Sequence, residues 1–347
     1  MSLSRVRTTP GSDRGHKLQV GFVPLIDAAP LIVASELSYF EDEGLDVQLQ
    51  KQIGWGNVRD RLTYGELHAS HAPLGMIPAS LCSVRHYEEP LGLLMSLSSG
   101  GNAITISRDL AGLGDGTTAP AAWRRQLGRP IRLAYVISVA THYSALCQVL
   151  QSAGLLLDRD VNFCVLPPSQ MPGLLERGTI DGFCAGDPWN TLAATREWGS
   201  IFRATTELFP DHPEKVLAVT RKWFDQNPAT AQKLARATQR GCDYCNNPAH
   251  YDELASMLAR YNYLGVDKKV LLNSLKIDSW FRTGVSRPRF RTFGSPGAAK
   301  ENSRIEWSIG QMVRWKALPS TVNPAQLARE CLLSEPELVG AGSRRSL

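Results

Sequence analysis

The segment from residue 177 to residue 215 contains residue types that could bind an anion. It reads RGTIDGFCAGDPWN, and PDHPEKVL follows about twenty residues later. The apolar run from Phe183 to Ala185 predicts a strand that ends in a turn of small residues, and TLAATREWG after it predicts a helix. Unpaired N–H groups and the helix dipole favour negative charge at such a place, and Lys215 would add a full positive charge. The plainer alternative is a strand-to-helix turn with a surface lysine.

Length and composition indicate a globular protein. The chain has 347 residues, 43% of them hydrophobic and 20% charged, which is enough for two domains with ample cores. The formal net charge of +5 is not gathered into a dense basic stripe, so direct binding of nucleic acid is not expected. No apolar run reaches the length that spans a bilayer, so no membrane span is expected either.

The N-terminus and the cysteines together predict a cytoplasmic protein. Residues 1–17 are polar, flexible and without the apolar core of a secretory signal, and the first cysteine, Cys82, comes too late for a lipoprotein signal. The seven cysteines are odd in number and irregularly spaced, as reduced thiols are. Cys242 and Cys245 form a CxxC without a second such pair, so we expect neither a metal nor a cofactor.

The order of the predicted elements favours an α/β fold. Residues 18–24 predict a strand, residues 31–40 an amphipathic helix that Asp27 could cap, and residues 45–49 a second strand. This βαβ opening predicts parallel strands with a right-handed crossover. Residues 111–121, rich in glycine, threonine and alanine, mark a crossing toward a second lobe.

The last third of the chain changes in character. From about residue 223 the pattern is helical, and residues 282–303, rich in Arg, Gly, Pro and Ser, predict a long loop. A helix over residues 303–318 closes the fold, and the segment 336–347 is expected to be disordered.

Several polar or aromatic side chains lie just beyond predicted strands, where ligands of open α/β sheets collect. Trp55, flanked by glycines, is either a pocket wall or an exposed packing residue. Asn102 lies in a turn of small residues between two strands. Thr141 and His142 stand at the start of a predicted helix, and a lone histidine there often only caps or packs.

Several long motifs occur together and in a fixed order. They are GFVPLIDAAPLIVASELSYFEDEGLDVQLQ, WGNVRDRLTYGELHASHAP, GNAITIS, PPSQM, DGFCAGDPWN and PDHPEKVLAVT. Over about residues 18–320 the chain resembles the nitrate-binding solute receptors of ABC importers (the NrtA type) and, most closely, the cytoplasmic NasS-like nitrate and nitrite sensors. LGMIPAS departs slightly from the apolar-Met-Pro run usual in that family.

The resemblance implies a two-lobed, type II periplasmic-binding-protein fold, with mixed sheets, flanking helices and the anion between the lobes. Lobe 1 would comprise residues 18–107 and 221–335, and lobe 2 residues 108–220. The residues implied to bind the anion come from both parts: Trp55 as the aromatic wall, Asn102, Thr141, His142, Ala185 through its backbone, and Lys215. The bicarbonate-binding relatives carry an acid at the position of Lys215, so its presence favours nitrate or nitrite.

Three functions follow from the resemblance. A cytoplasmic sensor would hold an RNA-binding antiterminator when free of anion and release it on binding. The solute-binding component of a nitrate importer would need an export signal, and none is visible in residues 1–17. An enzyme on the same fold is not expected, since the sequence shows no nucleophile–base pair at motif spacing and no cysteine-rich iron motif.

Overall fold

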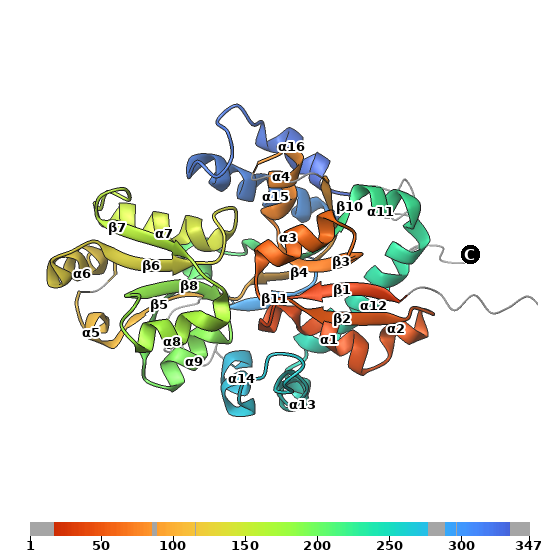
Figure 1. Cartoon of the computed structure of the whole chain (residues 1–347), viewed down its shortest axis with the longest axis horizontal. Helices are drawn as coiled ribbons and strands as arrows, with labels where there is room; N and C mark the ends of the chain where they lie inside the picture. Colours follow the sequence, from red (N-terminus) through yellow and green to blue (C-terminus); the bar gives the residue numbers. More distant parts are fainter. Residues whose placement is uncertain (1–16, 85–88, 115, 277–288, 296, 334–347) are drawn as a thin grey trace, which may run out of the picture.

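The strands of this protein form two sheets that lie side by side (Figure 1). The computed structural model describes residues 17–84, 89–114, 116–276, 289–295 and 297–333. Each sheet has helices against its faces, and the chain crosses from the first sheet to the second and back. The predicted α/β class with mixed sheets and flanking helices is thereby confirmed. We call the six-stranded sheet with its helices lobe 1 and the five-stranded sheet with its helices lobe 2.

Lobe 1 is built on a sheet in the order β11-β4-β10-β3-β1-β2. As the βαβ opening predicts, β1 pairs in parallel with β2 and β3. Strand β10 returns from late in the chain and pairs antiparallel with both β3 and β4. The strands are β1 (Leu18–Phe22), β2 (Val47–Lys51), β3 (Ala69–Pro73), β4 (Leu91–Gly100), β10 (Pro213–Thr220) and β11 (Arg291–Phe293).

Lobe 2 is built on a sheet in the order β7-β6-β8-β5-β9. Its central strand β8 pairs in parallel with β6 and antiparallel with β5. All five residues of β8 are buried, which suits a strand covered on both faces. The strands are β5 (Asn102–Ser107), β6 (Ile131–Tyr135), β7 (Val161–Val165), β8 (Gly182–Gly186) and β9 (Gly199–Ala204).

Helices cover both sheets and extend between them. Those of lobe 1 before the first crossing are η1 (Ile26–Ala28), α1 (Ala29–Glu36), α2 (Tyr39–Asp42), α3 (Trp55–Thr63) and α4 (Met76–Leu81). Those after β5 and before β10 are α5 (Arg108–Ala111), α6 (Ala119–Leu127), α7 (Thr141–Ser152), η2 (Pro168–Gln170), α8 (Met171–Glu176), α9 (Trp189–Thr195) and α10 (Thr205–Leu208). The remainder are α11 (Arg221–Gln226), α12 (Pro228–Asn246), η3 (Pro248–His250), α13 (Tyr251–Leu258), α14 (Lys268–Leu275), α15 (Ala298–Arg314) and α16 (Pro324–Cys331).

Several elements differ from the sequence prediction. The predicted loop over residues 282–303 is wrong in its described part, because β11 forms there and α15 already begins at Ala298. A three-residue strand is too short to show alternation, which is why β11 escapes pattern reasoning. Asp27 does not cap a helix N-terminus, because it lies inside η1 and its carboxylate accepts a hydrogen bond from a distant histidine. The flexible termini predicted at residues 1–17 and 336–347 fall, except for Lys17, outside the described residues.

At both crossings the chain passes from one sheet to the other before the residue at which the sequence predicted the lobe boundary. Strand β5, placed with lobe 1 by the boundary at residue 107, pairs within the lobe 2 sheet. Strand β10, placed with lobe 2 by the boundary at residue 220, pairs within the lobe 1 sheet. The reason is that backbone pairing with partners distant in sequence decides sheet membership, and local composition does not report it.

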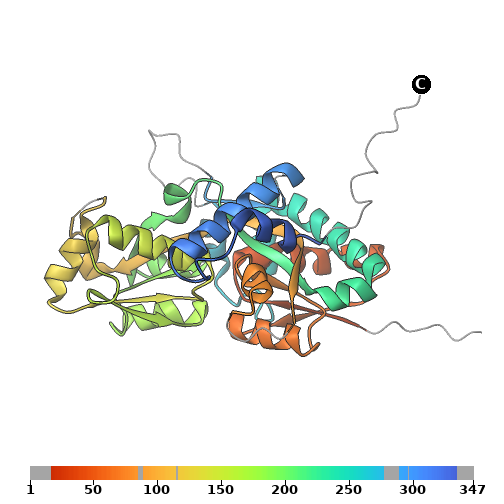
Figure 2. The same cartoon turned by 90° about the horizontal axis from the view of Figure 1, so that it is seen from above.

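The two lobes touch one another along their facing edges. The Trp189 indole Nε1 of lobe 2 donates a hydrogen bond of 3.1 Å to the Pro24 carbonyl of lobe 1. The Ile26 N–H donates to the Asp187 carbonyl at 2.8 Å. A Cβ on Gly75 would lie only 1.7 Å from the Val139 carbonyl oxygen, so the lobes also meet there. Helix α15 packs on α7 of lobe 2 as well as on α16, and it runs across the side of the molecule seen in Figure 2. The lobes are therefore closed on one another.

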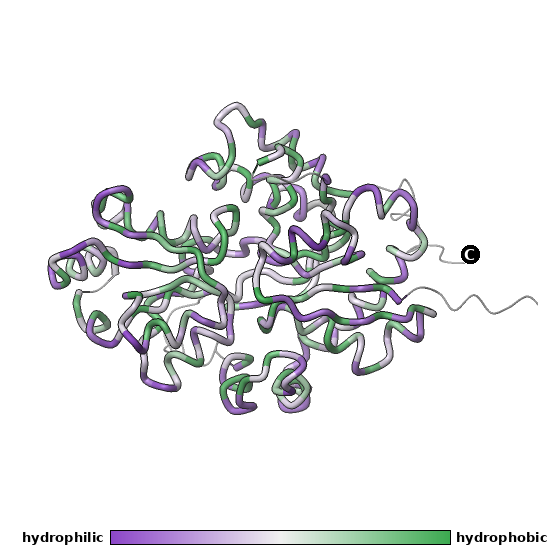
Figure 3. Tube along the Cα trace, in the orientation of Figure 1, coloured by the Kyte–Doolittle hydropathy of each residue, from purple (hydrophilic) through white to green (hydrophobic). Residues whose placement is uncertain are grey.

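Hydrophobic segments of the chain are short and alternate with hydrophilic ones (Figure 3). Among the residues that the structure describes, none of the helices has the length and apolar character needed to cross a membrane.

Candidate functional site

A fully buried lysine lies at the centre of the candidate site. Lys215, on β10, is 0% exposed, and its ammonium Nζ lies 3.1 Å from both Asp27 Oδ2 and Glu214 Oε2. Although burial lowers the pKa of Lys215, the two carboxylates raise it above its ordinary value, so the side chain is charged. Lys215 thus carries the positive charge that the sequence predicts, but two carboxylates that the sequence did not indicate lie against it.

Both carboxylates are ionised despite their burial. Burial raises the pKa of Asp27, but Lys215 and the neighbouring His71 lower it by more than burial raises it. The pKa of Asp27 is therefore well below its ordinary value. Burial also raises the pKa of Glu214, but Lys215 and the histidines 142 and 212 lower it by more, so its pKa is below the ordinary value. Two carboxylates and one ammonium leave a local charge of −2 + 1 = −1 when the histidines are neutral.

His71 anchors Asp27 from the core of lobe 1. Its Nε2 lies 2.8 Å from Asp27 Oδ1, and its Nδ1 accepts a hydrogen bond from the Val23 N–H at 3.5 Å. This pattern assigns the proton to Nε2, which donates to the carboxylate. Burial lowers the pKa of His71 below its ordinary value in spite of Asp27, so the ring is neutral at neutral pH.

Trp55 forms a wall beside the lysine. It is the first residue of α3 and is only 2% exposed, so the exposed alternative does not hold. Its ring lies edge-on to His71 at 5.2 Å between centroids, and Lys215 Nζ lies 5.8 Å from its centroid. The indole Nε1 is buried and has no hydrogen-bond partner among the described residues. A buried donor without a partner indicates a place where a ligand or water accepts its hydrogen bond.

Lobe 2 contributes two further unpartnered polar side chains. Asn102 begins β5 opposite Gly186, and its buried amide lies close enough to Glu214 to help lower the pKa of that carboxyl, although neither Oδ1 nor Nδ2 makes a well-formed hydrogen bond within the described structure. His142, the second residue of α7, is 1% exposed, and neither of its ring nitrogens has a hydrogen-bond partner there. Its Nδ1 lies 3.7 Å from Glu214 Oε1, which is also without a partner. Four polar groups from two lobes are thus left unsatisfied around Lys215.

Gly186 passes close to polar side chains of both lobes. A Cβ at this position would come within 3.3 Å of Asn102 Oδ1 and 3.6 Å of Asp27 Oδ2. A larger residue here would therefore require Asn102 to shift by a few tenths of an ångström. The adjacent Ala185 is buried, and its carbonyl accepts a hydrogen bond from Asn190 Nδ2 at 2.8 Å.

The turn after β8 does not present the open helix N-terminus expected from the sequence. The Asp187 carboxylate occupies the start of α9, because it accepts hydrogen bonds from the Thr191 N–H at 3.3 Å and hydroxyl at 2.7 Å. Ser274, on α14, donates to the same carboxylate at 2.5 Å. A carboxylate fixed at a helix N-terminus satisfies the positive end of the dipole, so an external anion is not needed there.

One predicted residue, Thr141, lies away from this cluster, and His212 has a partner of its own. Thr141, the first residue of α7, borders a narrow gap against α15 together with Trp307 and Gln311. His212 is held by Thr205, whose hydroxyl lies 2.8 Å from the His212 Nε2. The structure thus brings Trp55, Asn102, His142 and Lys215 around one buried point, and the role of all six predicted residues as ligands stays a prediction.

His142 gives this site an expected pH dependence. Burial, opposed by Glu214 and Asp27 and assisted by Lys215 and His212, lowers the pKa of His142 to about 4. A bound anion would add negative charge next to the ring and raise that pKa, so the complex should take up a proton. Anion affinity should then fall as pH rises above about 4, by up to about tenfold per pH unit, until the pKa of the complex is passed.

Calorimetry in two buffers of different ionisation enthalpy would measure this proton uptake directly. His142→Asn should abolish it, whereas His250→Asn, in η3 and outside the buried cluster, should leave it unchanged. A binding enthalpy that does not depend on the buffer would contradict the expected linkage.

Sequence reasoning missed three members of this cluster: Asp27, His71 and Glu214. All three lie inside the motifs already singled out, in FVPLIDAAP, HASHAP and PDHPEK. A titratable residue within an otherwise apolar segment was the available signal, because charged residues are rarely buried unless paired.

Comparison with known proteins places this geometry in context. The family model described as the NMT1-like family matches residues 12–259. The bicarbonate transport ATP-binding protein CmpC of Synechococcus elongatus is 32% identical over 90% of this chain, and the match covers 48% of CmpC. This chain therefore spans about half the length of that relative.

Two nitrate-binding proteins are also similar. The nitrate/nitrite binding protein NrtA of Synechococcus elongatus is 28% identical over 89% of this chain and 73% of its own length. The crystal structure of the periplasmic nitrate-binding protein NrtA from Synechocystis PCC 6803 superposes with a TM-score of 0.83 at 24% identity, over 90% of this chain and 85% of NrtA. These matches confirm the resemblance to nitrate-binding solute receptors and the periplasmic-binding-protein-like fold.

Proposed function

The chain belongs to the NMT1-like family, and from this premise we propose that it binds nitrate or nitrite in the closed space between its lobes. Relatives named as nitrate/nitrite binding proteins support this ligand. The fold alone does not separate binding from catalysis, so the proposal rests on the site. The residues we propose as ligands are the unpartnered Trp55, Asn102 and His142, together with the charged Lys215 that they surround.

One observation carries the proposal: buried donors without partners converge on one point from both lobes. The indole N–H of Trp55, the amide of Asn102 and a ring nitrogen of His142 are all unpartnered among the described residues. Nitrate offers only acceptor oxygens, so three or four converging donors match its chemistry. Charge-assisted hydrogen bonds of this kind are about twice as strong as neutral ones.

The negative charge of Glu214 disfavours the binding of nitrate at this site. Its unpartnered Oε1 faces His142 at 3.7 Å, and a second negative charge close to it is unfavourable. Protonation of His142 would remove that conflict, because the imidazolium would lie between the anion and the carboxylate. Bicarbonate would meet the same oxygen differently, since its own hydroxyl could donate to Glu214. The named bicarbonate relatives make bicarbonate the second candidate ligand.

Calorimetric titration of the whole chain with nitrate, nitrite and bicarbonate tests the ligand. We expect nitrate or nitrite to bind with one equivalent, and bicarbonate to bind more weakly by at least about tenfold. Binding of bicarbonate alone would assign the site to the second candidate, and no heat with any of the three would overturn the proposal.

We further propose that the protein is a cytoplasmic nitrate/nitrite sensor that controls an RNA-binding antiterminator for nitrate assimilation. All seven cysteines are free, as in reducing compartments. When the two lobes close around a shared site, the surface of the protein changes, and a partner protein can bind one of the two states in preference to the other. The alternative is the solute-binding component of a nitrate ABC importer. The relative named as a nitrate import ATP-binding protein favours that alternative.

The release of a partner separates these two roles. If the antiterminator binds the open form, nitrate must weaken that complex by the same factor by which the partner weakens nitrate binding. Capture from cytosol with and without nitrate should recover a soluble RNA-binding regulator only in the nitrate-free sample. Capture of permease or ATPase subunits, or recovery of the protein from the periplasm, would support the importer role instead.

A further inference from the structure

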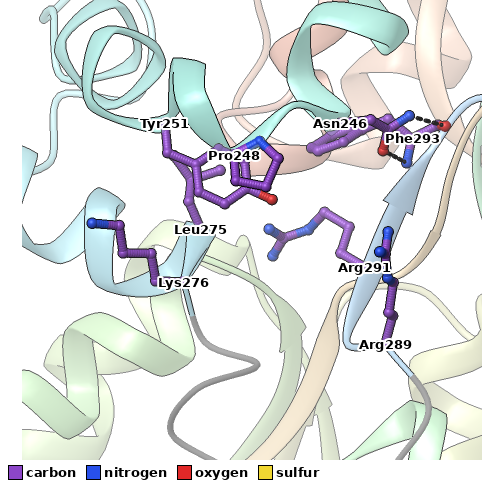
Figure 4. Close-up of a pocket in the computed structure, with 8 residues that line it drawn as sticks. All are labelled: Asn246, Pro248, Tyr251, Leu275, Lys276, Arg289, Arg291 and Phe293. Atoms are coloured by element: carbon purple, nitrogen blue, oxygen red, sulfur yellow. Dashed lines mark hydrogen bonds between the residues drawn. The ribbon is translucent and has the colours of Figure 1, made fainter.

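A cavity lies where α12, α13, α14 and β11 meet (Figure 4), and none of the residues of the Lys215 cluster lines it. It encloses about 360 Å³, within the range of small-molecule sites, about 300–1,000 Å³. Three of the residues that line it are basic: Lys276, Arg289 and Arg291. None of the described residues that line it is acidic.

Arg291 is the feature that indicates a missing ligand. Its side chain is only 6% exposed, and its Nε and Nη2 have no hydrogen-bond partner among the described residues. Figure 4 shows its guanidinium directed into the space between Leu275 and Arg289. A buried guanidinium without hydrogen bonds is costly, so an acceptor that reaches it would be strongly favoured.

Among the described residues, the carboxylate that the structure places near Arg291 is a distant one. Asp187 Oδ2 lies 4.0 Å from its Nη2, beyond hydrogen-bond reach. That same oxygen already accepts hydrogen bonds from Thr191 at 2.7 Å and Ser274 at 2.5 Å. Asp187 therefore offsets part of the charge of Arg291 but leaves its donors unused.

The remaining walls define the kind of ligand. Tyr251 and Pro248 present aromatic and apolar surface on one side. The Asn246 side chain is occupied, because it exchanges hydrogen bonds of 2.9 and 3.0 Å with the Phe293 backbone. Among the described residues that line the cavity, three are basic and none is acidic, and the carboxylate of Asp187 lies 4.0 Å from Arg291. We propose that this cavity is a second anion site, which takes an oxyanion carrying phosphate or carboxylate groups.

This site is distinct from the nitrate site in both charge and position. The surroundings of Lys215 carry −1 with neutral histidines, so a small monovalent anion binds there together with a proton on His142. The described residues that line the cavity at Arg291 include three basic side chains and no acidic one, and planar guanidinium groups bind phosphate and carboxylate in a bidentate manner. The proposal holds whichever anion occupies the first site.

Titration with inorganic phosphate and with citrate, in saturating nitrate, tests the second site. We expect one equivalent of phosphate or citrate to bind to the whole chain. The variant Lys276→Gln/Arg289→Gln changes two side chains at the cavity and should weaken this binding at least about tenfold, with nitrate affinity unchanged. The matched control Lys222→Gln/Lys300→Gln removes the same charge from exposed residues of α11 and α15, and should bind as the unmodified protein does.

Three results would overturn the proposal. One is the absence of heat with both probes at millimolar concentration. Another is equal weakening in the cavity variant and in the control variant, which would indicate only general electrostatic attraction. The third is loss of phosphate binding in Lys215→Met with no loss in Lys276→Gln/Arg289→Gln, which would place the probe in the first site.

Discussion

Replacing Lys215 with methionine is expected to abolish nitrate binding and to destabilise the protein at the same time. Asp27 and Glu214 both lie 3.1 Å from the lysine ammonium and are almost fully buried. Without it, two buried carboxylates face each other uncompensated, and breaking a buried pair in this way costs about 3–5 kcal/mol. Denaturant unfolding without nitrate would measure the stability, and calorimetry the binding.

A double variant separates the two effects. Glu214→Gln/Lys215→Met removes one of the stranded carboxylates, and the other, Asp27, keeps its hydrogen bond from His71. We expect the double variant to recover much of the lost stability but none of the nitrate affinity. A Lys215→Met protein as stable as the unmodified one would show that the lysine does not hold these carboxylates. Unchanged nitrate binding in that variant would remove Lys215 from the site.

Gly75→Ala is expected to prevent closure of the lobes and so to weaken nitrate binding by about 10²-fold or more, without touching the ligand. The backbone at Gly75 is ordinary right-handed helical, with φ −60° and ψ −15°, so alanine fits locally. Its Cβ would lie 1.7 Å from the Val139 carbonyl oxygen of the other lobe, however, and a backbone atom cannot yield that space. Small-angle scattering in saturating nitrate should give a larger radius of gyration than for the unmodified protein.

Gly56→Ala is the matched control for this prediction. It also lies in lobe 1, inside α3, and a Cβ there would meet nothing within 4 Å. It should leave the radius of gyration and the nitrate affinity unchanged and stabilise α3 slightly, by up to about 1 kcal/mol. Normal affinity in Gly75→Ala would show that the closed arrangement is not the one that binds the anion.

The elements near the first part of the chain were predictable because their signals are local. The strand-helix-strand order of residues 18–51 follows from apolar periodicity and from Gly44, and the structure pairs these strands in parallel as expected. The motifs also located Trp55, Asn102, His142 and Lys215 near strand ends. A residue's place at a strand end is a property of the chain's own pattern, so one sequence can report it.

Only the tertiary structure decided what these residues are paired with. Lys215 meets Asp27 because β10 inserts antiparallel between β3 and β4, next to the β1–η1 connection, and no local pattern encodes that pairing. The same pairing places the positive charge of Lys215 between two carboxylates, in a cluster with a charge of −1 when the histidines are neutral. Likewise the Asp187 carboxylate occupies the start of α9, which the sequence predicted to be available to an anion. Asp187 also contacts both proposed sites, because its carbonyl accepts a hydrogen bond from the Ile26 N–H and its carboxylate lies 4.0 Å from Arg291. The sequence determines which charges are present, but their pKa values and partners depend on burial and on distances of a few ångströms, which exist only once the two lobes have packed together.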